Sequence, residues 1–140
     1  MFIIMNKSIN NNFGKIRREL GEKSIKIFAG LYFKHYLDQP MCSFHEEMYQ
    51  MLYDMTHKRD ERKAVAAPRN SAKSSITSTI YPIWSLCYEK EKFIVILSDT
   101  KDKAVEFLSH IKTEIESNEN LRNDFPEIFG VKPKRWIMDE

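Results

Sequence analysis

Apolar residues recur at three- and four-residue steps in two stretches of the first half of the chain, which predicts two amphipathic helices. The first covers residues 22–37 and ends before Pro40, because the residue preceding a proline is driven out of the helical region. The second begins at Ser43, since Ser43 and Glu46 have the spacing of a capping box. Residues 1–12 lack this pattern and are expected to form a loose tail.

Short apolar runs alternate with helical patterns in the second half. Apart from Lys63, residues 63–67 and 93–97 are apolar and contain β-branched side chains, which is typical of strands that helices cover on both faces. Helical spacing occupies 72–86, where Pro82 is expected to kink or end the helix, and it returns after the capping oxygens of residues 98–100. A strand–helix–strand unit with short connections implies a right-handed crossover. The pattern therefore predicts an α/β fold with a parallel sheet, flanking helices and an N-terminal helical segment.

Composition and charge narrow the class of protein. The 140 residues include 22 Lys and Arg against 20 Asp and Glu, so the formal net charge is only +2 and a strongly basic nucleic-acid coat protein is excluded. Cys42 and Cys87 stand far apart without ligand spacing, which indicates two reduced thiols in an intracellular protein. No apolar run approaches the roughly 20 residues that cross a bilayer. We therefore expect a cytoplasmic protein with no membrane partner.

The turn between the first expected strand and the next helix carries candidate chemistry. It reads Ala67-Pro68-Arg69-Asn70-Ser71-Ala72-Lys73-Ser74 and fits the template GxxxxGK[ST], with alanine in place of both glycines. A helix start presents unpaired N–H groups and a partial positive charge, so it can bind phosphate. Lys73 could then reach the β- and γ-phosphates of ATP, Ser74 could ligate Mg²⁺, and Arg69 could engage the γ-phosphate.

The two alanines leave an alternative open for this turn. Alanine in a left-handed conformation costs about 1–2 kcal/mol, whereas glycine adopts it freely. The loop must therefore avoid positive φ at Ala67 and Ala72, or accept strain there. In the alternative interpretation, Lys73 and Ser74 are ordinary first-turn residues of a helix and bind no ligand.

Five stretches between Phe44 and about Asp124 match a known pattern in order and in spacing. They are Phe44-His45-x-Glu47-Met48-Tyr49, Ala66-Ala67-Pro68-Arg69-x-x-Ala72-Lys73-Ser74, Tyr81-Pro82-x-Trp84, Phe93-Ile94-Val95-Ile96-x-Ser98-Asp99-Thr100, and Ala104-x-x-Phe107-Leu108-x-x-Ile111-Lys112-x-Glu114. They resemble the N-terminal ATPase region of bacteriophage terminase large subunits. The resemblance implies a partial P-loop NTPase-type parallel sheet and a motor that couples ATP hydrolysis to packaging of double-stranded viral DNA. Its partners would be the portal and the small terminase subunit, in the cytoplasm of the bacterial host.

The resemblance also assigns roles to individual residues. It places the phosphates of ATP on residues 67–74, Mg²⁺ on the hydroxyl of Ser74, and a catalytic role on Arg69. The segment from Phe44 to Gln50 is similar to the region that contacts the adenine in these motors. Gln50 could therefore read the adenine edge, the alternative being a solvated helix residue.

The expected domain organisation is a tail and helical segment over residues 1–61, followed by the start of an ATPase domain over 62–140. Residues 136–140 end in Asp139 and Glu140, but only three apolar residues precede Asp139, so we reject them as the acidic motif of an ATPase. Later strands and a nuclease domain have no counterpart, and we expect negligible ATP hydrolysis by this chain. The alternative function is a non-catalytic prophage remnant or interaction module that binds a packaging partner through its N-terminal helices.

Overall fold

The chain folds into an assembly of helices. The computed structural model describes residues 2–37, 40–58 and 61–129, with side chains from residue 12 onward. About 70% of the described residues are helical, and none of them belongs to a strand or a sheet. In chain order the elements are α1 (Phe2–Lys23), α2 (Ile25–Tyr32), the 3₁₀ turn η1 (Lys34–Tyr36), α3 (Ser43–His57), α4 (Lys73–Ser75), the π-helical segment η2 (Ile76–Ile80), α5 (Tyr81–Cys87), α6 (Lys101–Ser117), α7 (Glu119–Asp124) and α8 (Pro126–Phe129).

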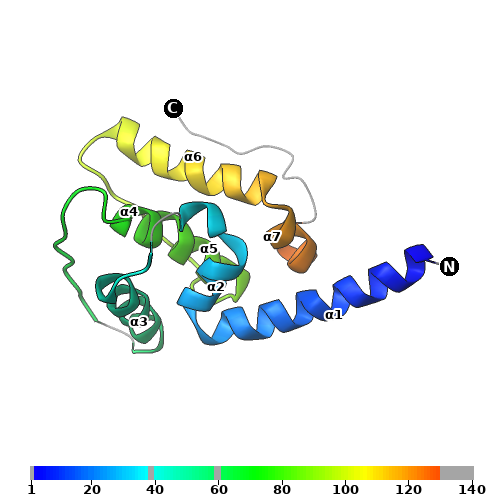
Figure 1. The fold of residues 1–140 in the computed structure, drawn as a ribbon. Coiled ribbons are helices and arrows are strands. Elements are labelled where there is room, and N and C mark those ends of the chain that lie inside the picture. Colours follow the sequence, from blue (N-terminus) through cyan, green and yellow to red (C-terminus); the bar gives the residue numbers. More distant parts are fainter. Residues whose placement is uncertain (1, 38–39, 59–60, 130–140) are drawn as a thin grey trace.

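The helices are arranged around α2 and α5 (Figure 1). Helix α1 packs against α2 and α7 through its C-terminal half, while its N-terminal half extends away from the rest of the molecule. Helix α3 packs against α2 on one side, and α6 lies across η2 on another. A long connection, residues 61–72, runs along the outer edge of the molecule and leads into α4.

The predicted parallel sheet of P-loop NTPase type is wrong for the described part of the chain. Residues 61–68 and 91–98 belong to neither a helix nor a strand, and no backbone hydrogen bond joins either segment to another described segment. Phe93 is 82% exposed and Leu97 is 87% exposed, so the strongest strand-like run faces solvent instead of a core. An apolar β-branched run becomes a strand only where a neighbouring strand pairs with it, and the pattern of the run carries no information on that neighbour.

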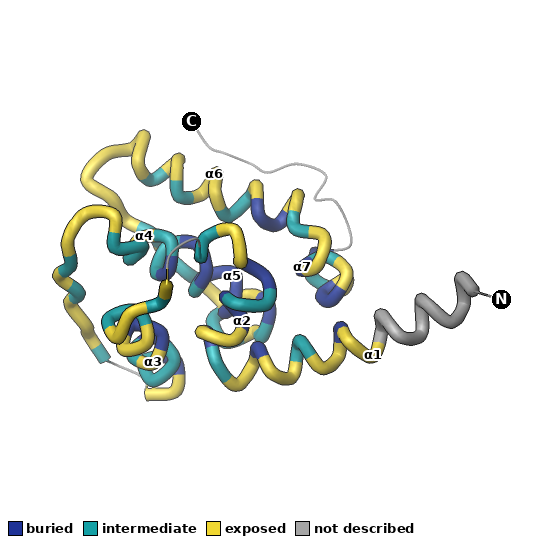
Figure 2. Tube along the Cα trace, in the orientation of Figure 1, coloured by how far each residue is buried: buried dark blue, intermediate teal, exposed yellow. Residues whose placement is uncertain are grey.

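The core consists of aromatic and aliphatic side chains from helices of both halves of the chain. Its largest fully buried members are Trp84 of α5, Phe28 of α2, Phe33, and Phe125 between α7 and α8. Figure 2 shows the buried positions concentrated on α2, α5 and α7, with the connection of residues 61–72 exposed or half-buried. The indole N–H of Trp84 donates to the Gly21 carbonyl at 2.9 Å and so ties α5 to the end of α1.

A buried carboxylate holds α1, α2 and α7 together. Asp124 at the end of α7 is 6% exposed, and its two oxygens accept hydrogen bonds from Arg17 Nε at 2.6 Å and Nη2 at 2.7 Å. The Tyr32 hydroxyl donates to the same carboxylate at 2.7 Å. The hydrogen bond with Asp124 raises the pKa of Arg17. Three charge-assisted hydrogen bonds satisfy a buried charge that would otherwise be strongly destabilising.

Several predicted helices are confirmed, with changes at their ends. Helix α3 begins at Ser43 as expected, but its N-cap is Cys42, one residue before the predicted cap. Helix α6 begins after Thr100, whose side chain accepts a hydrogen bond from the Lys103 N–H at 3.3 Å. The expected tail over residues 1–12 is wrong from Phe2 onward, because those residues continue α1.

The helix predicted over 72–86 is present as α4, η2 and α5, which follow one another from Lys73 to Cys87. Pro82 neither ends this helix nor stands outside it, since α5 continues to Cys87. The π-helical segment Ile76–Ile80 precedes the proline. A π segment shifts the hydrogen-bond pattern of a helix by one residue, so the helix can continue past Pro82 although proline has no N–H to donate.

Among the described residues, no helix combines the length and the apolar character needed to cross a bilayer. The expected cytoplasmic location stays a prediction.

Candidate functional site

The loop of residues 67–74, which we call the phosphate loop, is not part of a continuous helix. Residues 69–72 form turns and bends, and helical conformation begins at Lys73. The angle φ is +63° at Asn70 and +53° at Ala72, whereas Ser71 and Lys73 do not have positive φ. Alternation of this kind turns successive backbone N–H groups towards the same side and creates an anion-binding concavity. Of the two outcomes expected for Ala72, the loop accepts the strain.

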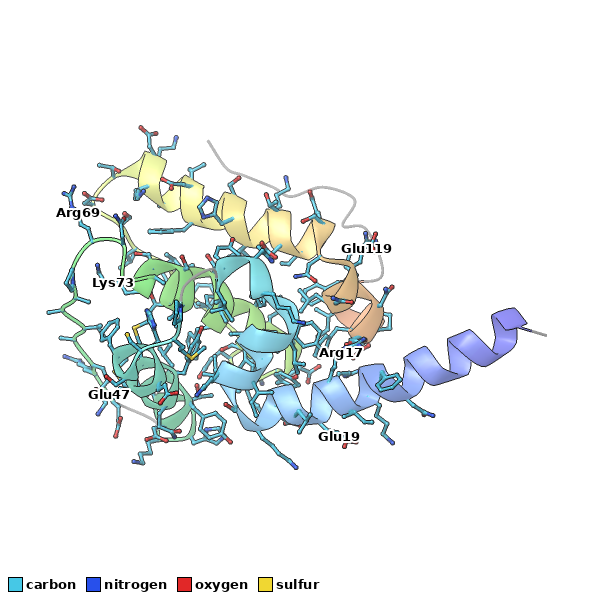
Figure 3. All side chains as sticks on the ribbon, in the orientation of Figure 1. Arg17, Glu19, Glu47, Arg69, Lys73 and Glu119 are labelled. Carbon is cyan, nitrogen blue, oxygen red and sulfur yellow. The ribbon has the colours of Figure 1, made fainter. Side chains whose placement is uncertain are left out.

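Lys73 points back into the curve of the phosphate loop (Figure 3). Its ammonium group donates to the carbonyls of Ala67 at 3.1 Å and Pro68 at 3.3 Å. The Ser71 hydroxyl also donates to the Pro68 carbonyl, at 2.8 Å. The loop is therefore wrapped around a positive charge, and its first carbonyls hold that charge beside the start of α4.

Ser74 and Arg69 are exposed at this site. Figure 3 shows Arg69 at the outer edge of the loop, away from the bend that Lys73 enters. No group of three or more His, Cys, Asp or Glu side chains among the described residues is arranged to hold a metal ion. Magnesium at this loop would thus be bound by the Ser74 hydroxyl together with phosphate oxygens and water, which are ligands that this ion commonly keeps. The rejected acidic motif at 136–140 lies outside the described residues.

A pocket of about 330 Å³ adjoins the phosphate loop. Its walls come from three places in the sequence and are Tyr36, Leu37, Met41, His45, Tyr49, Asn70, Ala72, Ser75, Ile76 and Ile80. Pockets for small ligands begin at about 300 Å³ and are mostly apolar with a few polar groups. The size and lining of this pocket fit a flat aromatic group connected to an anion on the loop.

One wall of this pocket carries a polar atom without a partner. Tyr49 is 2% exposed, and its hydroxyl forms no hydrogen bond with any described residue. Burial raises the pKa of Tyr49 to about 12, so the hydroxyl is neutral and able to donate at neutral pH. Buried hydroxyls are nearly always hydrogen-bonded, so an unpaired one is destabilising. The oxygen is itself fully buried, so Tyr49 contributes its ring to the pocket wall.

Gln50, the residue assigned to the adenine by resemblance, faces away from this pocket. It is exposed on α3, donates to Asp54 Oδ1 at 2.9 Å, and lines a different hollow beside the start of α2. Adjacent residues of a helix point in directions about 100° apart. Tyr49 lines both hollows, whereas Gln50 is not among the residues that line the pocket beside the phosphate loop.

His45 connects α3 to the phosphate loop. Its Nε2 lies 3.1 Å from the Ser71 carbonyl oxygen, and its Nδ1 lies 3.3 Å from the backbone nitrogen of Cys42. The sequence analysis missed this contact. The capping-box spacing at the start of α3 could have indicated it. The sequence analysis assigned that spacing to Ser43 and Glu46, whereas Cys42 and His45 form the cap.

A wider hollow of about 880 Å³ lies between α1 and α7, at a distance from the phosphate loop (Figure 3). Its walls include Arg17, Arg18 and Asp124, which are already paired: Arg18 donates to the Asp124 carbonyl at 3.0 Å and also pairs with Glu127. Polar walls whose charges are satisfied within the protein offer little to a ligand. The loop and the adjoining pocket are therefore the stronger candidate site.

Comparison with known proteins does not change this assignment. No protein-family model, no curated protein and no solved structure matches the chain. The likeness to terminase large subunits is therefore carried by the sequence stretches quoted above, and the function must be argued from the site itself.

Proposed function

We propose that this chain binds ATP, with its triphosphate on the phosphate loop and its adenine in the adjoining pocket. The observation that carries the proposal is the combination of positive φ at Asn70 and Ala72 with the ammonium group of Lys73 inside the same bend. An ordinary helix start requires neither feature. The cost of the left-handed conformation at Ala72 is offset if the N–H groups that it orients bind an anion.

Each part of the nucleotide has a partner of matching chemistry. The N–H groups of the loop and the charge of Lys73 bind the phosphates, which displace the carbonyl contacts that Lys73 makes with Ala67 and Pro68. Aromatic and aliphatic walls, among them the ring of Tyr49, accept the base. Magnesium bound with ATP supplies charge neutralisation at the phosphates, and the Ser74 hydroxyl is the protein group available to it.

We further propose that this binding unit is the N-terminal ATP-binding part of a terminase large subunit, the motor that packages viral DNA. The support is the sequence resemblance together with the loop geometry, where the deviant alanine does adopt the conformation that glycine has in such loops. Arg69 keeps its proposed role at the γ-phosphate, because its exposed side chain is free to move towards the bend. The proposal extends to ATP binding and not to hydrolysis, because no group of three or more His, Cys, Asp or Glu among the described residues could hold a metal ion.

The proposal is tested by titrating the chain with a fluorescent ATP analogue in the presence of Mg²⁺. Lys73→Ala should weaken binding by about 10-fold or more, because a charge-assisted hydrogen bond contributes about 1.5–3 kcal/mol. Lys101→Ala is the matched control: this exposed lysine at the start of α6 lies outside the site and should leave the affinity unchanged. Circular dichroism checks that both variants keep the parent fold.

Inorganic tripolyphosphate separates the two halves of the site. It should compete with the analogue at the phosphate loop but bind more weakly than ATP, because it leaves the pocket empty. A parent protein that binds neither compound, or Lys73→Ala bound as tightly as the parent, would contradict the proposal.

A second candidate is the interaction module. Phe13, Ile16 and Leu20 are 56%, 51% and 43% exposed, and their spacing places them on one face of α1. An exposed apolar stripe on a projecting helix is a feature of protein–protein contacts. This candidate is favoured if the chain fails to bind ATP but associates with a packaging partner in a way that Ile16→Glu abolishes.

A further inference from the structure

We infer that His45 is a positioning residue that holds the phosphate loop in its anion-binding conformation. The inference rests on the proposed function of that loop and goes beyond it by assigning a residue of another helix to its control. The observation is a pair of hydrogen bonds on the two nitrogens of one imidazole, one within α3 and one across to Ser71.

The two contacts define the state of the imidazole. The backbone N–H of Cys42 donates to Nδ1 at 3.3 Å, so Nδ1 is an acceptor and carries no proton. The proton of the neutral ring is then on Nε2, which donates to the Ser71 carbonyl at 3.1 Å. The Cys42 thiol, 3.4 Å from Nδ1, is a second donor towards the same nitrogen. A cationic ring would lose the Nδ1 acceptor, so only the neutral ring satisfies both contacts.

The contact with Ser71 bears directly on the loop. The peptide bond between Ser71 and Ala72 is planar and trans, so its carbonyl and its N–H point in opposite directions. By holding the Ser71 carbonyl towards α3, His45 directs the Ala72 N–H to the other side. Ala72 is the residue with left-handed backbone geometry, which alanine leaves easily unless neighbouring contacts hold it. The other end of Ala72 is held by the Ile76 N–H, which donates to its carbonyl at 3.0 Å.

Two neutral variants separate this role from simple capping of α3. The side-chain amide of asparagine reaches the position of Nδ1, whereas that of glutamine reaches the position of Nε2. His45→Asn should therefore keep the contact with the Cys42 N–H and lose Ser71, and His45→Gln should keep the donor to Ser71. We expect His45→Asn to weaken MgATP binding about 3- to 10-fold, the effect of one hydrogen bond, and His45→Gln, which keeps the donor to Ser71, to weaken it less than His45→Asn does.

The outcomes distinguish this inference from the proposed function. Two results would overturn the positioning role and leave ATP binding intact. Either the parent binds ATP and His45→Asn binds it equally tightly, or His45→Gln loses as much affinity as His45→Asn. Thermal unfolding midpoints of both variants are measured alongside, because a purely structural role would lower the midpoint in proportion to the lost affinity.

A measurement without nucleotide keeps the inference testable if ATP does not bind. In ¹⁵N spectra of labelled histidine, His45 should show a protonated Nε2 and an unprotonated Nδ1 at neutral pH. The amide of Ala72 should exchange its hydrogen faster in His45→Asn than in the parent and in His45→Gln. Rapid averaging between the two tautomers of His45, or equal exchange rates of the Ala72 amide in all three proteins, would refute the contact between His45 and Ser71.

Discussion

Tyr49 and Tyr32 carry the same buried hydroxyl group in opposite surroundings. The Tyr32 hydroxyl donates to the Asp124 carboxylate at 2.7 Å, while the Tyr49 hydroxyl has no partner among the described residues. Burial raises the pKa of both phenols, so each stays neutral under ordinary conditions. The first hydroxyl therefore stabilises the fold, whereas the second is maintained at a cost in stability.

The two phenylalanine variants should differ in sign. Tyr32→Phe removes a hydrogen bond to a buried charge and should lower the free energy of unfolding by about 1.5–3 kcal/mol. Tyr49→Phe removes an unsatisfied polar atom and should leave the free energy of unfolding unchanged or raise it by up to about 1 kcal/mol. Urea denaturation of both variants provides the measurement. An equal loss in both would mean that the Tyr49 hydroxyl is hydrogen-bonded after all.

At the scale of elements, the last turns of α1 approach the residues around the end of α5 closely. A methyl group on Gly21 would lie 2.6 Å from the Tyr88 hydroxyl oxygen and 3.2 Å from Phe28 Cδ2. The Tyr88 hydroxyl in turn donates to the Arg18 carbonyl at 2.8 Å, so it has little room to move without losing that bond. Glycine at this position permits the tight contact between the two helices.

Two glycine-to-alanine changes provide a matched test of this contact. Gly21→Ala should lower the free energy of unfolding by about 1–3 kcal/mol, because the added methyl group overpacks the contact with Tyr88. Gly30→Ala, in α2, meets no atom within 4 Å and should raise the free energy of unfolding by up to about 1 kcal/mol through better helix propensity. Thermal or urea unfolding compares them. If Gly21→Ala were also stabilising, the packing of α1 on α5 would have to be looser than described.

For the molecule as a whole, the segment 93–97 contains the most exposed large apolar side chains among the described residues. Phe93, Val95 and Leu97 are 82%, 59% and 87% exposed, although they belong to a run of five consecutive apolar residues. Extended apolar segments without a pairing strand are sites of aggregation. The chain is therefore expected to self-associate as its concentration rises.

Charged substitutions in that segment should suppress self-association without changing the fold. The double variant Phe93→Lys and Leu97→Lys should stay monomeric at concentrations where the parent associates, as measured by sedimentation velocity. Its free energy of unfolding should stay within about 0.5 kcal/mol of the parent value, because exposed side chains contribute little. Leu97→Ile keeps the apolar surface and serves as the control that still associates. Unchanged association in the lysine variant would mean that another surface mediates self-association. The exposed apolar residues Phe13, Ile16 and Leu20 of α1 would then be tested next.

The same segment shows why the predicted sheet was wrong. The composition of residues 93–97 favoured a strand, but it could not indicate whether another strand lies beside it. The hydrogen bonds of a sheet join residues that are far apart in sequence. In contrast, α3 and the helix from Lys73 to Cys87 were predicted correctly because caps and helical spacing act over only a few residues.

The sequence by itself determined where most helices form and where the candidate chemistry lies, since helical periodicity, capping oxygens and the Lys73–Ser74 pair are local features of the chain. Only the tertiary structure decided that Ala72 accepts a left-handed conformation, that Tyr49 and not Gln50 lines the pocket, and that His45 reaches Ser71. These features depend on contacts between α3 and a loop more than 20 residues away, and the direction in which a helix presents a side chain to a distant segment is set by packing.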